Sequence, residues 1–289
     1  MKLEWKQLSG LLFATPAFLY FLVFFIYPFL YNVYLSLHAW DLISPMEFIG
    51  VKNYYRMVYV DPILPKSILV TLYYVVGASI PIWIFSLAFA LWFNNQFSNK
   101  RLYIVIFLMA CLMGLVPSLM AWKILLHQEY GLFNKIFFYS WGFDKPLNWL
   151  QNSSLAMPGI IITSLSTGIP FYAIYLISAV ASVPEEYYEV AKIEGANFLQ
   201  RLWHVILPTI KPVYIFVIIV SIITGFQYLG PFYILTGGGP VDATRVVSLH
   251  IWLNAFKYNK FGYATALTLA LLIILIPITY LSLKLGDDR

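Results

Sequence analysis

The sequence predicts an all-α membrane protein in which six helices cross the bilayer. Of its 289 residues, 61% are hydrophobic and only 11% are charged, whereas soluble domains carry about 25% charged residues. Six apolar stretches reach the roughly 20 residues that a helix needs to span the hydrocarbon core. The formal net charge of +5 suits a chain that lies against anionic lipid. We therefore expect membrane lipid, and no nucleic acid, among its partners.

The first expected span covers residues 11–37. The chain opens with a short basic segment and then carries no charge from Gln7 to Trp40. This stretch is too long for the apolar part of a cleavable signal peptide, which is short and ends at small residues. We therefore expect an uncleaved first span.

Five further apolar stretches are the other expected spans: 68–94, 102–122, 156–181, 212–235 and 261–283. The last of them, FGYATALTLALLIILIPITYLSL, has no charged residue, and each large apolar residue favours insertion by about 0.3–0.6 kcal/mol. Glycine and proline interrupt several spans, and interrupted helices occur at membrane depth where they line a cavity or pack on protein. We expect residues 1–289 to form a single transmembrane domain.

The segment 182–211 is too charged to cross the membrane. Seven charges at about 2.5–3.5 kcal/mol each would cost roughly 20 kcal/mol at the bilayer centre. They are Glu185, Glu186, Glu189, Lys192, Glu194, Arg201 and Lys211. This segment must therefore be a loop between two spans.

Local signals predict short helices within this loop. Ser182 and Glu185 have the spacing of a capping box, with Pro184 in the first turn. Gly195 predicts a bend between two helical pieces, and Pro208 and Pro212 mark the entry to the next span. An amphipathic helix resting on the membrane surface is the structural alternative.

The loop's side of the membrane follows from the basic residues. With a cytoplasmic N-terminus, nine Lys and Arg residues fall inside and nine outside, so the raw count does not decide. The inside set lies in shorter segments near the span ends, where positive charge has most influence on orientation. We expect both termini and the loop 182–211 to be cytoplasmic.

The loop also carries a motif. Glu189-Val190-Ala191, three residues, Gly195, nine residues and then Val205-Ile206-Leu207-Pro208 resemble the EAA loop of binding-protein-dependent ABC importer permeases, whose usual form is EAA-x3-G-x9-I-x-L-P. Val190 and Val205 are mild departures. Further segments resemble the maltose and glycerol-phosphate branch of this family: PAFLYFLVFFIYPFLYNVYLSL, FIGVKNYYRM, YILTGGGP and FGYATALTLAL.

The resemblance implies the type I ABC importer permease fold in a prokaryotic inner membrane. It implies that the loop forms a coupling helix held by a cytoplasmic ATPase. The residues that it assigns to this coupling are Glu189, Val190, Ala191, Glu194, Gly195, Ala196, Leu207 and Pro208. It also implies a second, related permease, two ATPase subunits that bind ATP and Mg²⁺, and an extracytoplasmic solute-binding protein. This chain itself would bind no cofactor.

The spans themselves also point to an external energy source. No Asp, Glu, Lys or Arg lies in the middle of an expected span, where ion-coupled carriers place such groups. The G-x-x-x-x-G-K pattern of a phosphate-binding loop is missing as well. ATP hydrolysis on a partner protein fits both observations.

A sugar pathway is expected in the fourth and fifth spans. SLSTGIPF and SIITGFQYLGPF combine neutral polar side chains with aromatic rings, which suit the hydroxyls and ring faces of a sugar. The resemblance implies that seven residues fall where maltose-type permeases contact sugar. They are Ser164, Thr167, Gly168, Ser221, Gly225, Gln227 and Tyr228. The alternative is that these residues only pack one helix against another.

Other functions have less support. A stand-alone secondary carrier or channel for a small polar solute is the second candidate. The feature against it is that the expected spans of this chain lack an intramembrane carboxylate. A membrane enzyme would need convergent acids or histidines, and the external acids are scattered singly; we expect no catalytic residue and no metal site. Arg245, Lys257 and Lys260 could meet a docked binding protein, although a solvated loop is the simpler interpretation.

Overall fold

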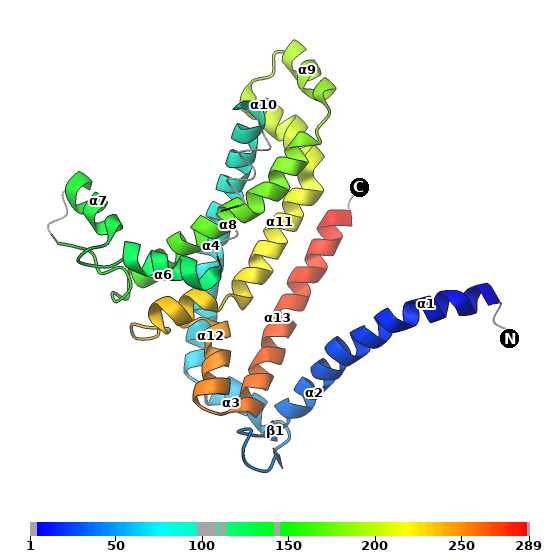
Figure 1. The fold of residues 1–289 in the computed structure, drawn as a ribbon, viewed down its shortest axis with the longest axis vertical. Coiled ribbons are helices and arrows are strands. Elements are labelled where there is room, and N and C mark those ends of the chain that lie inside the picture. Colours follow the sequence, from blue (N-terminus) through cyan, green and yellow to red (C-terminus); the bar gives the residue numbers. More distant parts are fainter. Residues whose placement is uncertain (1–4, 97–108, 110–113, 142–144, 288–289) are drawn as a thin grey trace. The chain divides into compact units, whose positions relative to one another are not determined.

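The computed structural model describes residues 5–96, 109, 114–141 and 145–287 (Figure 1). The chain divides into two compact units. The first comprises Met1–Pro62 and Ile251–Ile273, and the second comprises Ile63–His250 and Ile274–Arg289. Two helices, α12 (Val247–Trp252) and α13 (Phe261–Asp287), contain residues of both units.

The first unit begins with a long helical segment that ends in a hairpin. Its elements are α1 (Trp5–Phe21), the π-helical turn η1 (Leu22–Ile26), α2 (Tyr27–Ser36), β1 (His38–Ala39), β2 (Glu47–Phe48), α3 (Lys52–Tyr59) and the π-helical turn η4 (Leu253–Lys257). The two strands pair antiparallel, with His38 opposite Phe48. Asn53 ties α3 to this hairpin, because its buried amide donates to the carbonyls of Ser36 (2.8 Å) and His38 (3.0 Å).

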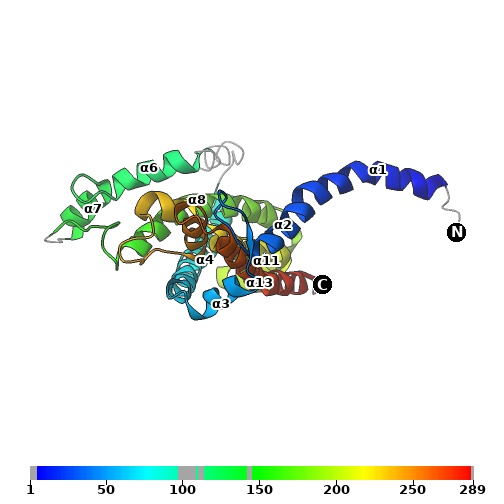
Figure 2. The same cartoon turned by 90° about the horizontal axis from the view of Figure 1, so that it is seen from below.

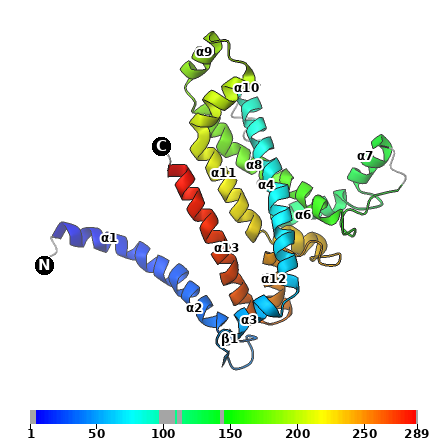
Figure 3. The same ribbon diagram turned by 180° about the vertical axis from the view of Figure 1, so that it is seen from behind.

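The second unit is built on three long helices. Its elements are α4 (Ile63–Gln96), α6 (Leu115–Leu125), α7 (Leu132–Trp141), α8 (Ala156–Ala181), α9 (Glu185–Ile193), α10 (Phe198–Arg201), the π-helical turn η2 (Leu202–Ile206), α11 (Leu207–Gln227) and the π-helical turn η3 (Phe232–Thr236). Helices α9 and α10 lie at one end of the group formed by α4, α8 and α11 (Figures 1 and 3). Helices α6 and α7 extend away from this group (Figure 2).

Five segments of the described residues are long and apolar enough to cross a membrane. They are Phe13–Ser36, Ile63–Asn94, Ala156–Ala181, Phe198–Thr236 and Phe261–Tyr280. The first, second, fourth and sixth expected spans are confirmed as helices. Most of the expected third span, 102–122, lies outside the described residues, and its end coincides with the shorter apolar helix α6.

The helix that contains the expected fifth span begins well before that span. Helix α10, η2 and α11 follow one another without a break from Phe198 to Gln227, whereas the span was expected to begin at residue 212. The backbone can pass Pro208 because a π-helical turn precedes it, in which the N–H of Leu207 bonds to the carbonyl of Leu202. Proline has no N–H to donate, so helices continue through it only where the local hydrogen bonding adjusts.

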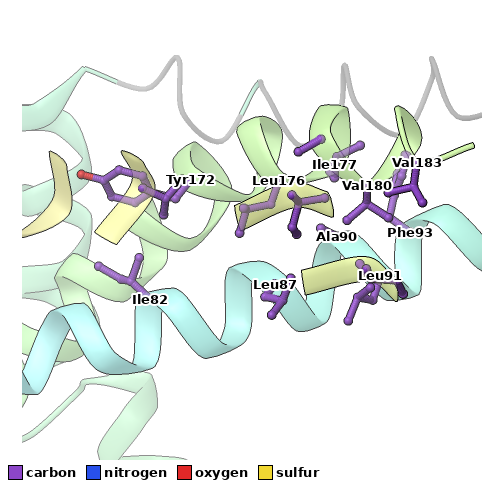
Figure 4. Close-up of a cluster of buried hydrophobic side chains, with 14 residues drawn as sticks. Ile82, Leu87, Ala90, Leu91, Phe93, Tyr172, Leu176, Ile177, Val180 and Val183 are labelled. Carbon is purple, nitrogen blue, oxygen red and sulfur yellow. The ribbon is translucent and has the colours of Figure 1, made fainter. Parts of the chain in front are cut away.

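The core of the second unit lies between α4, α8 and α11 (Figure 4). Leu87, Ala90 and Phe93 of α4 face Leu176 and Val180 of α8 in one buried cluster. Small residues allow this close approach: a Cβ on Gly77 would lie 2.8 Å from the Cδ1 of Ile161. Association of helices in lipid depends on such packing, since lipid chains are as apolar as leucine.

Candidate functional site

The loop between α8 and α11 has a defined backbone structure. At the end of α9, the N–H of Gly195 bonds to the carbonyl of Lys192 (3.1 Å) and the N–H of Ala196 to the carbonyl of Ala191 (2.9 Å). Gly195 itself has φ +75°. This pair of bonds around a left-handed residue is the Schellman motif that closes a helix. The predicted bend at Gly195 is confirmed.

The predicted capping box at Ser182 is wrong. Helix α9 starts after Pro184, and no side chain of the described residues caps its first N–H groups. The hydroxyl of Ser182 instead donates to the carbonyl of Ala179 at the end of α8 (2.8 Å). Serine side chains bond readily to carbonyls three residues earlier, so this local contact replaces the cap.

A capping box does exist in the loop, at a position that sequence reasoning missed. The side chain of Asn197 accepts from the N–H of Gln200 (2.9 Å), and the side chain of Gln200 accepts from the N–H of Asn197 (2.8 Å). These residues hold the start of α10. The N-x-x-Q spacing directly after the predicted bend is the signal that could have revealed it.

The predicted coupling residues differ in their exposure. Glu189, Val190, Glu194, Gly195 and Pro208 are exposed, whereas Ala196 and Leu207 are half-buried and Ala191 is buried. On α9 and its end, large apolar side chains also face outward: Val190 is 55% exposed and Ile193 is 86% exposed. Large exposed apolar groups beside carboxylates are typical of a protein-binding surface.

Two further residues of the loop were missed. Tyr188 packs against the core cluster between α4, α8 and α11, and its hydroxyl is buried without a hydrogen-bond partner among the described residues. Burial raises the pKa of Tyr188, and the nearby charge of Arg201 lowers it in part. The Nε of Arg201 is likewise buried and has no hydrogen-bond partner in the described chain. Tyr188 attaches the α9–α10 turn to the membrane helices.

A cavity of about 330 Å³ lies between α4, α8 and α11. Six of the seven predicted pathway residues line it: Ser164, Thr167, Gly168, Ser221, Gly225 and Tyr228. Gln227 does not line it, although it directly precedes the lining residue Tyr228 in the chain. The tertiary structure therefore brings together residues that are far apart in the sequence.

Helix α4 contributes a third wall that sequence reasoning missed. Tyr74, Ala78 and Ile82 line the cavity, and their i, i+4, i+8 spacing places them on one face of the helix. This regular spacing was the available signal. The hydroxyl of Tyr74 donates to the Oγ of Ser164 (3.0 Å).

Other hydrogen bonds fix the hydroxyls that line the cavity. The indole Nε1 of Trp83 donates to the Oγ of Ser221 (2.7 Å), which donates in turn to the carbonyl of Ile218 (2.7 Å). Thr167 donates to the carbonyl of Ser164 (3.3 Å). Lining side chains are thereby held in place before any solute arrives.

The two glycines also pack helices together. A Cβ on Gly168 would lie 2.7 Å from the Cδ1 of Ile82, and one on Gly225 would lie 3.1 Å from the Cγ2 of Val75. Both contacts are to α4. Helix packing and cavity lining are therefore combined at these positions.

The chemistry of the cavity is neutral. Its described lining consists of hydroxyl, aromatic, aliphatic and glycine residues, with no charged side chain. An ion would lose its hydration here without a compensating charge, whereas a polyhydroxylated solute could exchange its water contacts for hydroxyl partners. The arrangement suits a neutral polar solute.

Arg245 is not on the exposed surface that the sequence suggested. The residue is 7% exposed, and its Nη1 lies 3.1 Å from the Oδ1 of Asp242. The loop that contains it folds back, with the hydroxyl of Thr244 donating to the carbonyl of Gly239 (2.8 Å). Arg245 therefore stabilises its own loop.

Comparison with known proteins places this architecture in context. A family model described as binding-protein-dependent transport system inner membrane component matches residues 67–285. The probable ABC transporter permease protein YesP of Bacillus subtilis is 30% identical over 282 residues, covering 96% of this chain and 90% of that protein. The trehalose/maltose transport system permease protein MalF of Thermococcus litoralis is 29% identical over 290 residues, covering 100% and 97%.

A solved structure shares the fold. It is a crystal structure of a bacterial alginate ABC transporter in complex with an alginate pentasaccharide-bound periplasmic protein. One of its chains superposes with a TM-score of 0.79 at 19% sequence identity, over 98% of both chains. The likeness extends over nearly all of the chain.

Proposed function

Because this chain belongs to the family of binding-protein-dependent transport system inner membrane components, it is a membrane permease subunit, and we propose that it carries a sugar or oligosaccharide into the cytoplasm. The energy comes from ATP hydrolysis in separate ATPase subunits. The cargo arrives on an extracytoplasmic binding protein. The whole chain acts as one transmembrane permease domain.

The neutral cavity is the observation that carries this proposal. Hydroxyls of Ser164, Thr167 and Ser221 stand beside the rings of Tyr74 and Tyr228, which is the combination that binds sugar hydroxyls and sugar ring faces. Gly168 and Gly225 line the same cavity. The similarity to a trehalose/maltose permease supports a saccharide as the solute.

The α9–α10 turn is the contact with the ATPase. Glu189 and Glu194 offer carboxylates to basic residues of the partner, while Val190 provides an apolar contact. Gly195 and Ala196 form the Schellman turn that keeps α9 in shape, and buried Ala191 lies beneath the exposed face. Leu207 and Pro208 connect this turn to α11.

The continuous helix from α10 to α11 supports a lever mechanism. It runs unbroken from Phe198 at the turn to Gln227, directly before the cavity residue Tyr228. At 1.5 Å per residue, Phe198 lies about 35 Å along the helix from Ser221. A movement of the turn when the ATPases close would therefore displace one wall of the cavity, as in other domain closures driven by nucleotide.

The assembly contains a second, related permease, two cytoplasmic ATPases and the binding protein. A cavity walled by three helices of a single chain does not by itself form a closed path across a membrane, so a membrane partner completes it. A heterodimer of two different permeases supplies that partner. Both termini and the α9–α10 turn face the cytoplasm, as the distribution of basic residues near the span ends favours.

Reconstitution tests the proposed function. The permease pair, its ATPases and its binding protein are placed in proteoliposomes. Uptake of a panel of neutral sugars is then measured with and without ATP on the side of the membrane where the ATPases lie. We expect uptake that depends on both ATP and the binding protein. Uptake by the permease alone, driven by an ion gradient, would show that the chain is a secondary carrier instead.

A further inference from the structure

The second unit contains an apolar groove that is separate from the sugar cavity. It has a volume of about 920 Å³ and runs between α4 and the continuous helix that begins at Phe198. It lies at the end of the unit where α9 and α10 are found (Figures 1 and 3). We call it the lysine groove, because Lys211 is the one charged residue in its described lining and the other lining residues are apolar or aromatic.

A hydrogen bond between the two walls indicates how deep the lysine groove lies in the membrane. The indole of Trp83 on α4 donates to the hydroxyl of Ser221 on α11, and both residues are near the middle of the expected spans 68–94 and 212–235. Towards the α9–α10 turn, Trp92 lies about 14 Å from Trp83 along α4, and Lys211 about 15 Å from Ser221 along α11. Half of the hydrocarbon core is about 15 Å thick, so Trp92 and Lys211 are both at the boundary between hydrocarbon and headgroups.

The aromatic residues of the groove agree with this depth. Trp92 is 51% exposed and Trp203 is 64% exposed, and both line the groove. Tryptophan is enriched at membrane–water boundaries, because its amphipathic ring sits at the level of the headgroups. Lys211 therefore lies among residues that are typical of this boundary.

Inward from Lys211 the lysine groove is apolar. Ile84, Leu87 and Leu91 of α4 line this part. Ile84 is eight residues from Trp92, so the apolar wall extends about 12 Å towards the middle of the membrane, which approaches the thickness of one leaflet of the hydrocarbon core. Both walls belong to segments that are apolar enough to cross a membrane. The groove is therefore long enough to take an acyl chain of one leaflet.

Lys211 has no counterion in either wall of the groove. Neither α4 nor the helix from Phe198 to Gln227 contains an Asp or Glu residue, and the glutamates of α9 do not line the groove. Among the described residues no salt bridge involves Lys211. A cation beside hydrocarbon is costly unless a negative charge accompanies it. At the level of the headgroups, that negative charge is available from the phosphate of an anionic lipid.

We infer that the lysine groove binds an anionic phospholipid of the leaflet on the side of the α9–α10 turn. Its phosphate lies against the ammonium of Lys211, and one acyl chain lies along Ile84 and Leu91. Basic pockets between membrane helices bind anionic headgroups in this way. The bound lipid contacts both α4 and the helix that links the turn to the sugar cavity. It therefore stabilises the packing of these two helices, whichever solute the transporter carries.

The experiment uses the chain purified in a neutral detergent together with the subunits that accompany it in the membrane. Native mass spectrometry gives the apparent dissociation constant of the first added phosphatidylglycerol, and of phosphatidylcholine as the lipid without net charge. Lys211→Gln removes the cation, and Ala88→Phe fills the apolar part of the groove but keeps the cation. Lys284→Gln is the matched control, because Lys284 is exposed in the last turn of α13 and does not line the groove.

Wild type is expected to bind phosphatidylglycerol about fivefold more tightly than phosphatidylcholine, which is the contribution of one basic residue near a membrane surface. Lys211→Gln should lose this preference, and Ala88→Phe should lower the affinity for both lipids. Lys284→Gln should keep the wild-type values. The preference should shrink as salt is added, because salt screens interactions between exposed charges.

Four results would overturn the inference. Wild type could bind the two lipids equally, or Lys284→Gln could lose the preference as fully as Lys211→Gln; either result removes the site at Lys211. If inorganic phosphate displaces phosphatidylglycerol, the groove is a site for soluble anions and not for lipid. If Ala88→Phe releases a companion subunit while lipid binding stays at the wild-type level, the groove is a contact between subunits. The proposed sugar transport is unaffected in all four cases, since uptake is not the quantity measured.

Discussion

Replacing Gly195 by alanine should lower the affinity of the permease for the ATPase without changing the fold of the membrane helices. Gly195 has φ +75°, and no atom lies within 4 Å of the position that a Cβ would take. The change therefore creates no clash. It only forces an L-residue into the left-handed region, which costs about 1–2 kcal/mol.

This cost falls on one turn. The two bonds at risk are those from Gly195 to Lys192 and from Ala196 to Ala191, both at the exposed end of α9. A partner that binds the closed turn must restore it, so its affinity should fall by at most about 5- to 30-fold, at 1.4 kcal/mol per tenfold. Membrane insertion and the unfolding temperature should match wild type.

The assay is a titration of the purified permease pair with the ATPase, followed by coupled uptake in proteoliposomes. Gly195→Asn should have a smaller effect, because asparagine tolerates the left-handed region better. Gly237→Ala is the matched control: it has φ +60° and equally open surroundings, but it lies in the loop between η3 and α12. Normal ATPase affinity in Gly195→Ala, or equal weakening in Gly237→Ala, would refute the reasoning.

Three further changes test the other sites. Glu189→Gln should leave insertion intact and lower coupled uptake about tenfold, because a charged contact with the ATPase is lost; unchanged uptake would exclude that contact. Ser164→Ala should cost about 1–3 kcal/mol in thermal unfolding by leaving the buried Tyr74 hydroxyl unpaired. Adding Tyr74→Phe to Ser164→Ala should restore the stability but not the sugar uptake. Restored uptake would argue against a sugar contact at these two residues. Tyr263→Phe should lower stability by about 1.5–3 kcal/mol through the lost bond to Asp61, and an unchanged unfolding midpoint would show that bond to be unimportant.

Sequence reasoning located the membrane helices because their signal is local. A run of apolar residues such as Ala156–Ala181 needs no knowledge of its neighbours to be recognised, since every backbone group in a helix is satisfied within the segment. The bend at Gly195 is equally local, because it depends only on the backbone conformation of that one residue.

The errors arose where two local solutions compete or where contacts are distant. Ser182 had the spacing of a cap, but its hydroxyl bonds backwards to the carbonyl of Ala179. Pro208 and Pro212 were taken as the entry to the fifth span, whereas a π-helical turn carries one continuous helix through Pro208 from Phe198 onward. Arg245 was expected in solvent and instead folds against its own loop.

The amino-acid sequence alone determined that this is a membrane protein, which segment is too charged to cross the membrane and which motif that segment carries, because composition and short-range spacing contain that information. Only the tertiary structure decided that Tyr74 and Ile82 face Ser164 and Ser221 across one neutral cavity, and that Trp92 and Lys211 line one groove. Side chains separated by many residues come together through helix packing. Packing depends on shape complementarity between whole helices, so the spacing within one helix does not show which residues of another helix it will face.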